Sequence, residues 1–415
     1  MVTIKDIQVF CTAPAGINLV VAKVYTSEDG LFGLGCGTFA YRYAAVKFVI
    51  ETYVKPLLIG RDVSRITDLW QLMNQNAYWR NGPIVNNAIS AIDIALWDIK
   101  GKMANMPVYD LLGGKCRDGV ALYRHVDGRN FDEVCQKVEA FKSEGIKYLR
   151  CELHGSDNKK IGAKPSHAAQ GNSRGIFLDN RAYMRETVGL FEGLRDRFGD
   201  EVELISDLHE RLDPCEAVDF FHQMEGVKPF FIEDPVPVEQ LDWIKRLRTT
   251  STIPLAMGEL FTNPVEWKGL IRDHDIDFIR VHLSQIGGIT PAIKLAAFAG
   301  EMGVKICWHG PGDMTPMAHA ANVHLDLAFP NFSIQEWGGI EPSKKVQEKL
   351  GVGKDILYEV FPGMPQMGGD GFLYASDKPG LGIDFNESLA AKYHCNDGET
   401  VWTQTRSLDG SIQWP

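Results

Sequence analysis

The sequence predicts an α/β protein, a (β/α)8 barrel preceded by an α+β capping domain. Three observations lead to this prediction. Short apolar runs alternate with amphipathic helical patterns over residues 116–375, which is typical of parallel strands joined by helices. Eight of these runs carry a polar residue at or near their end, as the strands of a closed eight-stranded barrel do. Residues 1–115 follow a different pattern, so a separate domain is expected there.

The first domain is expected to begin with an antiparallel sheet. Residues 2–13 and 17–40 alternate apolar and polar positions around a Ser-Glu-Asp-Gly turn. Helical patterns follow at residues 45–60, 66–75 and 86–104. The last segment, residues 376–415, is irregular and is expected to pack back on this first domain.

Three acidic residues end successive apolar runs of the barrel region at a constant interval. Asp207, Glu233 and Glu259 are separated by 233 − 207 = 26 and 259 − 233 = 26 residues. A strand, a crossover helix and a return loop need about that length, and barrel enzymes build their active sites at the C-terminal ends of the strands. A single acid after an apolar run is usually a capping residue, but the repeated register favours a site. Carboxylates without a partnering cysteine suit a hard divalent cation, so Mg²⁺ is the expected metal.

Other polar residues continue this register on both sides. His125 and Arg150 lie near the ends of the first two runs, and Arg280, His309 and Glu336 follow the last three. Because the C-terminal ends of parallel strands meet at one edge, these side chains are expected to lie close together. For Arg280 and Glu336, a structural ion pair in the barrel mouth remains an equal alternative.

One interval between successive predicted strands is longer than the others. The distance from Arg150 to Asp207 is 57 residues, about twice the usual interval, and the excess lies in the polar stretch from His154 to Asp179. Loops of this length inside compact domains are usually functional or disordered. Because it follows the second strand at the predicted catalytic face, we interpret it as a lid, with an inert insertion as the alternative.

The composition narrows the class of protein. The chain has 415 residues, a net charge of −11 and 45% hydrophobic residues, which argues against nucleic acid or an anionic membrane as a partner. The eight cysteines form no CxxC pair and are expected to be reduced thiols. No stretch of about 18 apolar residues predicts a membrane span. A cytoplasmic protein is therefore expected.

Several ordered motifs resemble those of one enzyme group. They are ISAIDIALWDIKGKMANMPVYDLLGG, SDLHERLDPCEA, IEDPVP, GEL, SQIGGIT, WHGPGDMTPMAHAA and PNFSIQEW. Together they resemble the enolase superfamily, and within it the mannonate/galactonate dehydratase branch that includes starvation-sensing proteins. The resemblance runs nearly end to end and implies the same fold. It also implies removal of a proton next to a carboxylate and loss of a β-hydroxyl, giving a 2-keto-3-deoxy sugar acid.

The resemblance also assigns roles to individual residues. Asp207, Glu233 and Glu259 would hold Mg²⁺, and His209, two residues after Asp207, would act as acid or base beside the metal. In an extended segment, the side chains of residues 207 and 209 would face the same way; a locally bonded histidine is the alternative. The remaining matches are catalytic or substrate-binding residues: His309, Arg150, His125, Arg280, Asp313 and Glu336.

The chain also departs from its relatives. The segment KYLRCEL lacks the Lys-x-Lys pair of mandelate racemases, and no tyrosine lies between His154 and Asp179, where mannonate dehydratases carry one as a base. Ala40 stands where relatives have a substrate-binding asparagine. These departures argue against mannonate as the substrate. Three hypotheses remain: a dehydratase of another acid sugar, a regulatory protein that binds a sugar acid, and an epimerase. A homo-oligomer is expected from the resemblance.

Overall fold

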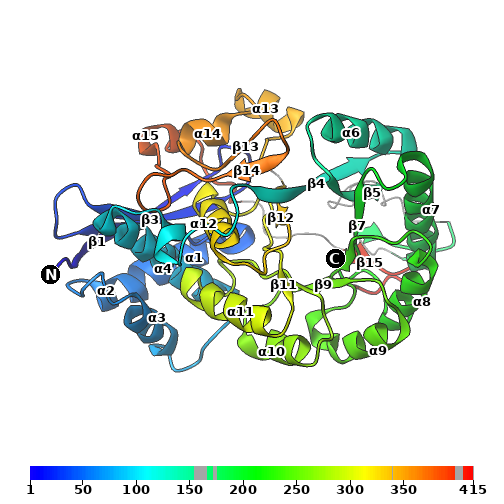
Figure 1. Ribbon diagram of the computed structural model, residues 1–415, viewed down its shortest axis with the longest axis horizontal. Helices are drawn as coiled ribbons and strands as arrows, with labels where there is room; N and C mark the ends of the chain where they lie inside the picture. The colour runs from blue at the N-terminus through cyan, green and yellow to red at the C-terminus, as the bar shows by residue number, and fades with distance from the viewer. Residues whose placement is uncertain (154–165, 172–174, 339, 398–404, 415) are drawn as a thin grey trace.

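The computed structural model describes residues 1–153, 166–171, 175–338, 340–397 and 405–414 (Figure 1). The chain begins with a three-stranded antiparallel sheet in the order β1 (Ile4–Thr12), β2 (Leu19–Thr26) and β3 (Phe32–Cys36). Helical segments follow, shown in blue and cyan in Figure 1: η1 (Ala40–Arg42), α1 (Tyr43–Val49), η2 (Ile50–Val54), α2 (Lys55–Leu58), α3 (Ile66–Gln75), α4 (Pro83–Ala104) and α5 (Val108–Leu111). The sheet and the helices predicted from the sequence are both present.

Helix α4 packs directly on strand β3 because two strand residues lack side chains. A Cβ atom on Gly33 would lie 2.0 Å from the carbonyl oxygen of Ala95, and one on Gly35 would lie 2.0 Å from that of Ala91. Only glycine permits so close an approach of two backbones. The alternation of glycine in LFGLGCG therefore fixes where the long helix sits on the sheet.

The second part of the chain is a closed eight-stranded parallel barrel, which confirms the predicted fold class. Hydrogen bonds link its strands in chain order, β12 pairs with β4, and a bridge between Ile306 and Phe332 joins β11 to the segment before β12. The strands are β4 (Val120–Gly128), β5 (Tyr148–Leu153), β7 (Glu203–Asp207), β8 (Phe231–Glu233), β9 (Leu255–Met257), β10 (Phe278–Ile279), β11 (Lys305–Ile306) and β12 (Gln335–Glu336).

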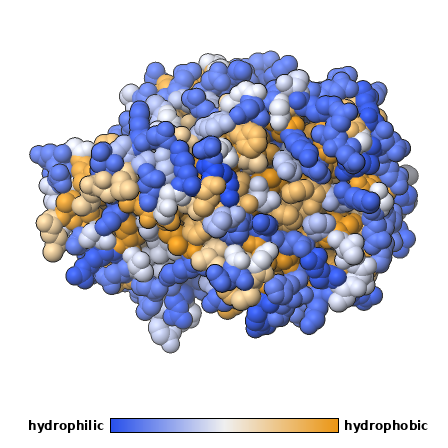
Figure 2. Space-filling model, in the orientation of Figure 1, coloured by the Kyte–Doolittle hydropathy of each residue, from blue (hydrophilic) through white to orange (hydrophobic). Residues whose placement is uncertain are grey.

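Helices surround the barrel strands (Figure 1). They are α6 (Phe131–Ser143), α7 (Asn180–Phe198), α8 (Pro214–Met224), α9 (Asp242–Thr250), α10 (Pro264–Arg272), α11 (Ile289–Glu301) and α12 (Pro316–Ala328), with the short η3 (Val238–Gln240). On the face seen in Figure 2, hydrophilic residues cover the periphery and apolar residues run in a band across the middle. None of the described helices combines the length and the apolar composition needed to cross a bilayer.

The segment after the barrel contacts both parts of the molecule. It contains α13 (Lys344–Leu350), α14 (Ile356–Val360), β13 (Gln366–Met367), β14 (Phe372–Tyr374), α15 (Glu387–Ala390) and β15 (Thr405–Arg406). Its α15 region binds the first domain, since the Thr12 hydroxyl donates to the carbonyl oxygen of Ala390 at 2.8 Å. Strand β15 pairs instead with β6 (Ile176–Phe177), after β5. The boundaries near residues 115 and 375 stay predictions.

Most of the predicted lid lies outside the described residues. Residues 154–165 and 172–174 of the stretch 154–179 are not described. The described remainder is tied to the end of the chain: the backbone N–H of Ala169 donates to the carbonyl oxygen of Leu408 at 2.8 Å, and that of Leu178 donates to Arg406 at 2.9 Å. The base of the insertion and residues 405–413 therefore form one contact region, which the sequence did not predict.

Candidate active site

A cavity of about 550 Å³ lies at the C-terminal ends of the barrel strands, where the first domain meets the barrel. Seven of the ten predicted site residues line it: His125, Arg150, His209, Glu259, His309, Asp313 and Glu336. The others, Asp207, Glu233 and Arg280, are buried behind its wall. The remaining lining residues are Gly16, Ile17, Phe39, Ala40, Tyr41, Glu210, Leu260, His282, Gln285, Pro311 and Gly312.

Two arginines link the three carboxylates predicted to bind metal. Nη1 of Arg150 lies 2.6 Å from Oδ2 of Asp207 and 3.7 Å from Oε1 of Glu233. Arg280 approaches Glu233 from the other side, with Nε 2.9 Å from Oε2, and its Nη1 lies 3.2 Å from Oε2 of Glu259. The constant spacing in the sequence therefore does bring the three acids to one place.

Arg280 forms a network of buried ion pairs in this arrangement. Its side chain is fully buried, and besides Glu233 and Glu259 it contacts Asp234 at 2.8 Å and Glu336 at 2.9 Å. Glu259 and Glu336 line the cavity, whereas Arg280 does not. These contacts agree with the structural ion pair that the sequence left as the alternative, and a contact of Arg280 with substrate stays a prediction.

Burial and the neighbouring cations shift the pKa values of these acids in different directions. Burial raises the pKa of Glu233 well above its ordinary value, with Arg280 opposing this only in part. Burial acts in the same direction on Asp207, but Arg150, His209, Arg280 and Arg211 together outweigh it and lower the pKa of that carboxyl. The pKa of Glu336 is held well below its ordinary value because His309, Arg280 and His125 together outweigh burial. The pKa values of carboxyl groups within one cluster are thus shifted in opposite directions.

The acids fit a hard divalent cation. Asp207, Glu233 and Glu259 offer only carboxylate oxygens, and Oε1 of Glu233 is buried without a hydrogen-bond partner. Among the residues with a described placement, no three His, Cys, Asp or Glu side chains converge on one point as metal ligands do. The guanidinium groups of Arg150 and Arg280 stand between the carboxylates instead. The two guanidinium groups place positive charge among the carboxylates, where a bound divalent cation would add further positive charge.

Two histidines contact opposite oxygens of one carboxylate. Nε2 of His209 lies 3.4 Å from Oε1 of Glu259, and Nε2 of His309 lies 3.3 Å from Oε2. His209 reaches this position from a left-handed turn, with φ of 49° there and 60° at Glu210. The prediction that the segment after Asp207 is extended is therefore wrong, because the chain turns sharply to bring His209 to the cavity.

The remaining predicted substrate residues lie on the same wall. Nε2 of His125 lies 2.7 Å from Oε1 of Glu336, and the absence of a side chain at Gly338 leaves room for that imidazole. Burial raises the pKa of Asp313, whose Oδ1 is buried without a hydrogen-bond partner. The cavity therefore combines histidines with carboxyl groups whose pKa values are shifted in different directions, as proton-transfer sites do.

Comparison with known proteins agrees with this architecture. Residues 2–113 match the family model of the mandelate racemase / muconate lactonizing enzyme N-terminal domain, and residues 138–389 match the enolase C-terminal domain-like model. Two relatives, a D-galactonate dehydratase family member of Musicola paradisiaca and the family member RspA of Pantoea ananatis, are each 47% identical over 99% of both chains. The chain belongs to the D-galactonate dehydratase family of the enolase superfamily.

A solved structure of the same superfamily covers the whole chain. An enolase from Pantoea ananatis, crystallised with bound D-gluconate and Mg, is 46% identical, covers 100% of each chain and has a TM-score of 0.93. The family resemblance predicted from the motifs is therefore confirmed.

The departures from the pattern of the mannonate dehydratases have visible structural counterparts. Tyr183, the first tyrosine after the insertion, is buried and its hydroxyl lies 3.4 Å from the carbonyl oxygen of Asp207, so it faces the strand and not the cavity. His167 lies 3.5 Å from Asp179 and does not line the cavity. Lysines 159, 160 and 164 of the insertion, which could also replace the missing tyrosine as a base, lie outside the described residues. Ala40 does line the cavity, where it contributes only a methyl group.

Of two aromatic segments of the first domain, residues 39–43 and 78–81, the first contributes to the cavity wall. Phe39, Ala40 and Tyr41 line the cavity. Residues 78–81 do not, and Tyr78 and Trp79 are 77% and 82% exposed.

Sequence reasoning missed several residues of the cavity wall, among them Glu210, Leu260, His282 and Gln285. His282 had a readable signal, because it follows Arg280 by two residues as His209 follows Asp207. Glu210 had none, since the left-handed turn that brings it to the wall cannot be read from the letters. Burial raises its pKa to about 8.

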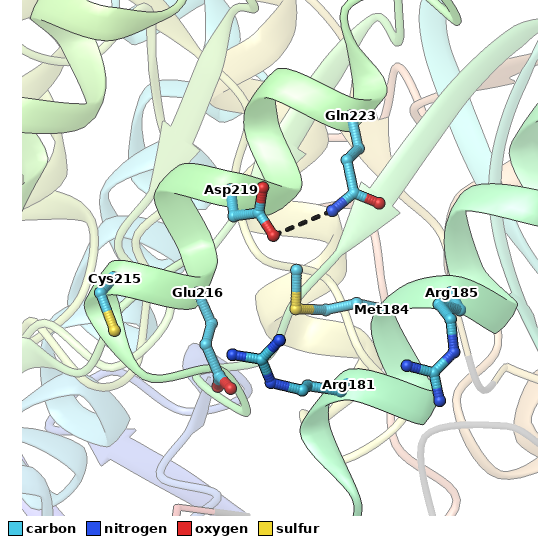
Figure 3. Close-up of a pocket in the computed structure, with 7 residues that line it drawn as sticks. All are labelled: Arg181, Met184, Arg185, Cys215, Glu216, Asp219 and Gln223. Atoms are coloured by element: carbon cyan, nitrogen blue, oxygen red, sulfur yellow. Dashed lines mark hydrogen bonds between the residues drawn. The ribbon is translucent and has the colours of Figure 1, made fainter.

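A second hollow lies away from the strand ends, between α7 and α8 (Figure 3). It measures about 180 Å³ and contains none of the predicted site residues. Figure 3 shows the hydrogen bond between Gln223 and Asp219, 3.0 Å long, on its α8 side. Its lining residues are Arg181, Met184, Arg185, Cys215, Glu216, Asp219 and Gln223. The candidate active site is therefore the larger cavity at the strand ends.

Proposed function

We propose that this protein is a Mg²⁺-dependent dehydratase of an acid sugar. It removes the proton next to the substrate carboxylate and expels the β-hydroxyl, giving a 2-keto-3-deoxy acid. The observation that carries the proposal is the pair of histidines, His209 and His309, on either side of Glu259 in a cavity backed by further buried carboxyl groups. The Pantoea relative, with its bound D-gluconate and Mg, supports the choice of ligand and metal.

Asp207, Glu233 and Glu259 would hold the metal. When bound, Mg²⁺ supplies positive charge that stabilises the enediolate left after proton removal. The arrangement of the three carboxylates suits a bound cation. All three are at least nine-tenths buried, and two arginines contact them with opposite charge. Buried carboxylates need such a counter-charge to remain in place.

His209 and His309 carry out the two proton transfers. One removes the proton at C2, and the other donates a proton to the departing hydroxyl oxygen at C3. Arg150 lines the cavity, and its guanidinium would attract the substrate carboxylate. His125, Asp313 and Glu336, which also line the cavity, would bind substrate hydroxyls. Water is excluded where Phe39 and Tyr41 cover the cavity from the first domain.

Two other functions remain as candidates. Histidines on two sides of one carboxylate would also suit an epimerase, which removes a proton from one face of a carbon and returns it to the other. The missing loop tyrosine favours a third possibility, a sugar-acid-binding regulatory protein. Loss of a general base typically lowers a rate by about 10²–10⁴-fold. A weak enzyme and a binding protein would therefore differ only in their rate of turnover.

A panel of hexonates and uronates with Mg²⁺ tests the proposal. We expect at least one acid to give a 2-keto-3-deoxy product, and we expect Glu233→Gln to abolish it. The control variant is Glu239→Gln, on the nearby η3. It makes the same chemical change and should leave turnover unchanged. No product from any acid, by a protein that still binds Mg²⁺ and a sugar acid, would contradict the dehydratase and favour the binding protein.

A further inference from the structure

An imidazole that the proposed chemistry does not use, His282, lies on the wall of the cavity. It follows β10, and its backbone forms a parallel bridge to that of His309 after β11. The two rings are 5.2 Å apart between centroids and tilted by 58°. His282 is therefore placed against a residue proposed to move a proton, although only 3% of its surface is exposed.

The ring of His282 has no hydrogen-bond partner in the described part of the chain. Its Nδ1 is buried and unpaired, and no hydrogen bond from Nε2 is formed within those residues. A core histidine normally satisfies its nitrogens, as His324 does: Nδ1 lies 3.2 Å from the backbone N of Tyr109, and Nε2 lies 3.2 Å from the carbonyl oxygen of Leu381. Buried polar groups are rarely left unpaired, and one at a cavity wall points to a partner that arrives with the ligand.

The surroundings of His282 keep its ring neutral. Burial lowers its pKa to about 3, and the neighbouring His309 and His319 act in the same direction, against Glu259 and Glu336. A neutral imidazole presents one N–H donor and one acceptor lone pair. This pair matches a hydroxyl group, which both donates and accepts, better than it matches a carboxylate, which only accepts and which Arg150 can attract.

We propose that His282 binds a hydroxyl group of the sugar acid and so helps to determine which acids the cavity accepts. The inference rests on the proposed function, because it needs a polyhydroxylated ligand in this cavity. It assigns His282 a binding role and leaves the proton transfers to His209 and His309. A site built to pair with a hydroxyl discriminates against ligands that lack it.

Two variants test the role. His282→Phe keeps a ring against His309 but has no nitrogen, and His282→Asn keeps a donor and an acceptor. We expect calorimetry with D-gluconate and D-galactonate in Mg²⁺ to show about tenfold weaker binding to the Phe variant of whichever acid the wild type binds, the loss of one neutral hydrogen bond. The Asn variant should recover part of that loss. The melting temperature of the Phe variant should be unchanged or higher, because an unpaired buried group has been removed.

The outcomes separate the two proposals. Equal affinity of the wild type and the Phe variant would overturn the role of His282 alone. A wild type that neither binds these acids nor converts any hexonate would overturn both. If the Phe variant does not fold, ¹⁵N chemical shifts of the His282 ring in the wild type decide, since adding the acid should move them and unchanged shifts would contradict the inference.

Discussion

Asp93 should make the stability of the protein depend on pH near neutrality. It lies on α4 in the first domain, fully buried, and its carboxylate contacts the start of α11 in the barrel. The backbone N–H of Thr290 donates to Oδ2 at 2.9 Å, and the Thr290 hydroxyl lies 2.5 Å from Oδ1. Burial nevertheless dominates and raises the pKa of Asp93 to about 7, from 3.8.

The sign and the size follow from these two values. Between pH 4 and pH 7 the folded protein holds a proton on Asp93 that the unfolded chain has released. Stability therefore falls as the pH rises through this window, by about 1.4 kcal/mol per pH unit and by about 4 kcal/mol in total. Above pH 7 both states are ionised and this contribution becomes constant.

The variant Asp93→Asn removes the titration and keeps a side chain of the same shape. Urea unfolding at fixed pH values from 5 to 8.5 measures the free energy of unfolding of both proteins. The stability of the variant relative to the wild type should rise by about 1.4 kcal/mol per unit up to pH 7 and then level off. Asp68→Asn, on the exposed face of α3, is the control and should show no such slope. Parallel curves for wild type and Asp93→Asn would refute the reasoning.

Three further changes probe the site. Arg280→Met leaves Glu233 and its neighbours without their buried cation and should lower the free energy of unfolding by about 3–5 kcal/mol in urea titrations; an unchanged midpoint would contradict the structural role. Gly338→Ala places a Cβ atom 2.5 Å from Cε1 of His125, so KM should rise about tenfold with little change in kcat, and an unaltered KM would show that His125 does not contact substrate. His309→Asn should lower kcat by about 10²–10⁴-fold while calorimetry shows that the sugar acid still binds; full activity would remove His309 from the mechanism.

The barrel could be predicted from the sequence because its repeat has a fixed length. Asp207 and Glu233 are the last residues of β7 and β8, and Glu259 follows β9 by two residues. A strand, a helix and a return loop repeat at nearly constant length, so polar residues at that interval must meet at one edge. This is why the positions of the acids and of His309 could be expected before the structure was known.

The partners of each side chain could not be predicted in the same way. Alternation places Arg280 inside the barrel, but a long guanidinium can reach either the cavity or the acids behind it, and only packing decides. The turn at His209 and Glu210 depends on left-handed backbone angles that non-glycine residues rarely adopt. The pairing of β15 with β6 joins segments more than 200 residues apart, and neither segment has a sequence pattern that predicts it.

The most direct test of the account is a proton NMR experiment in D₂O with Mg²⁺ and the best-bound hexonate. A dehydratase removes the C2 proton, expels the C3 hydroxyl and takes up solvent deuterium at C3 when the enol becomes a ketone. We predict a 2-keto-3-deoxy product with deuterium at C3, and no product with Glu233→Gln. Deuterium at C2 of an intact or epimerised acid would indicate an epimerase, and a bound acid that exchanges no proton would indicate a binding protein. Either result would contradict the dehydratase.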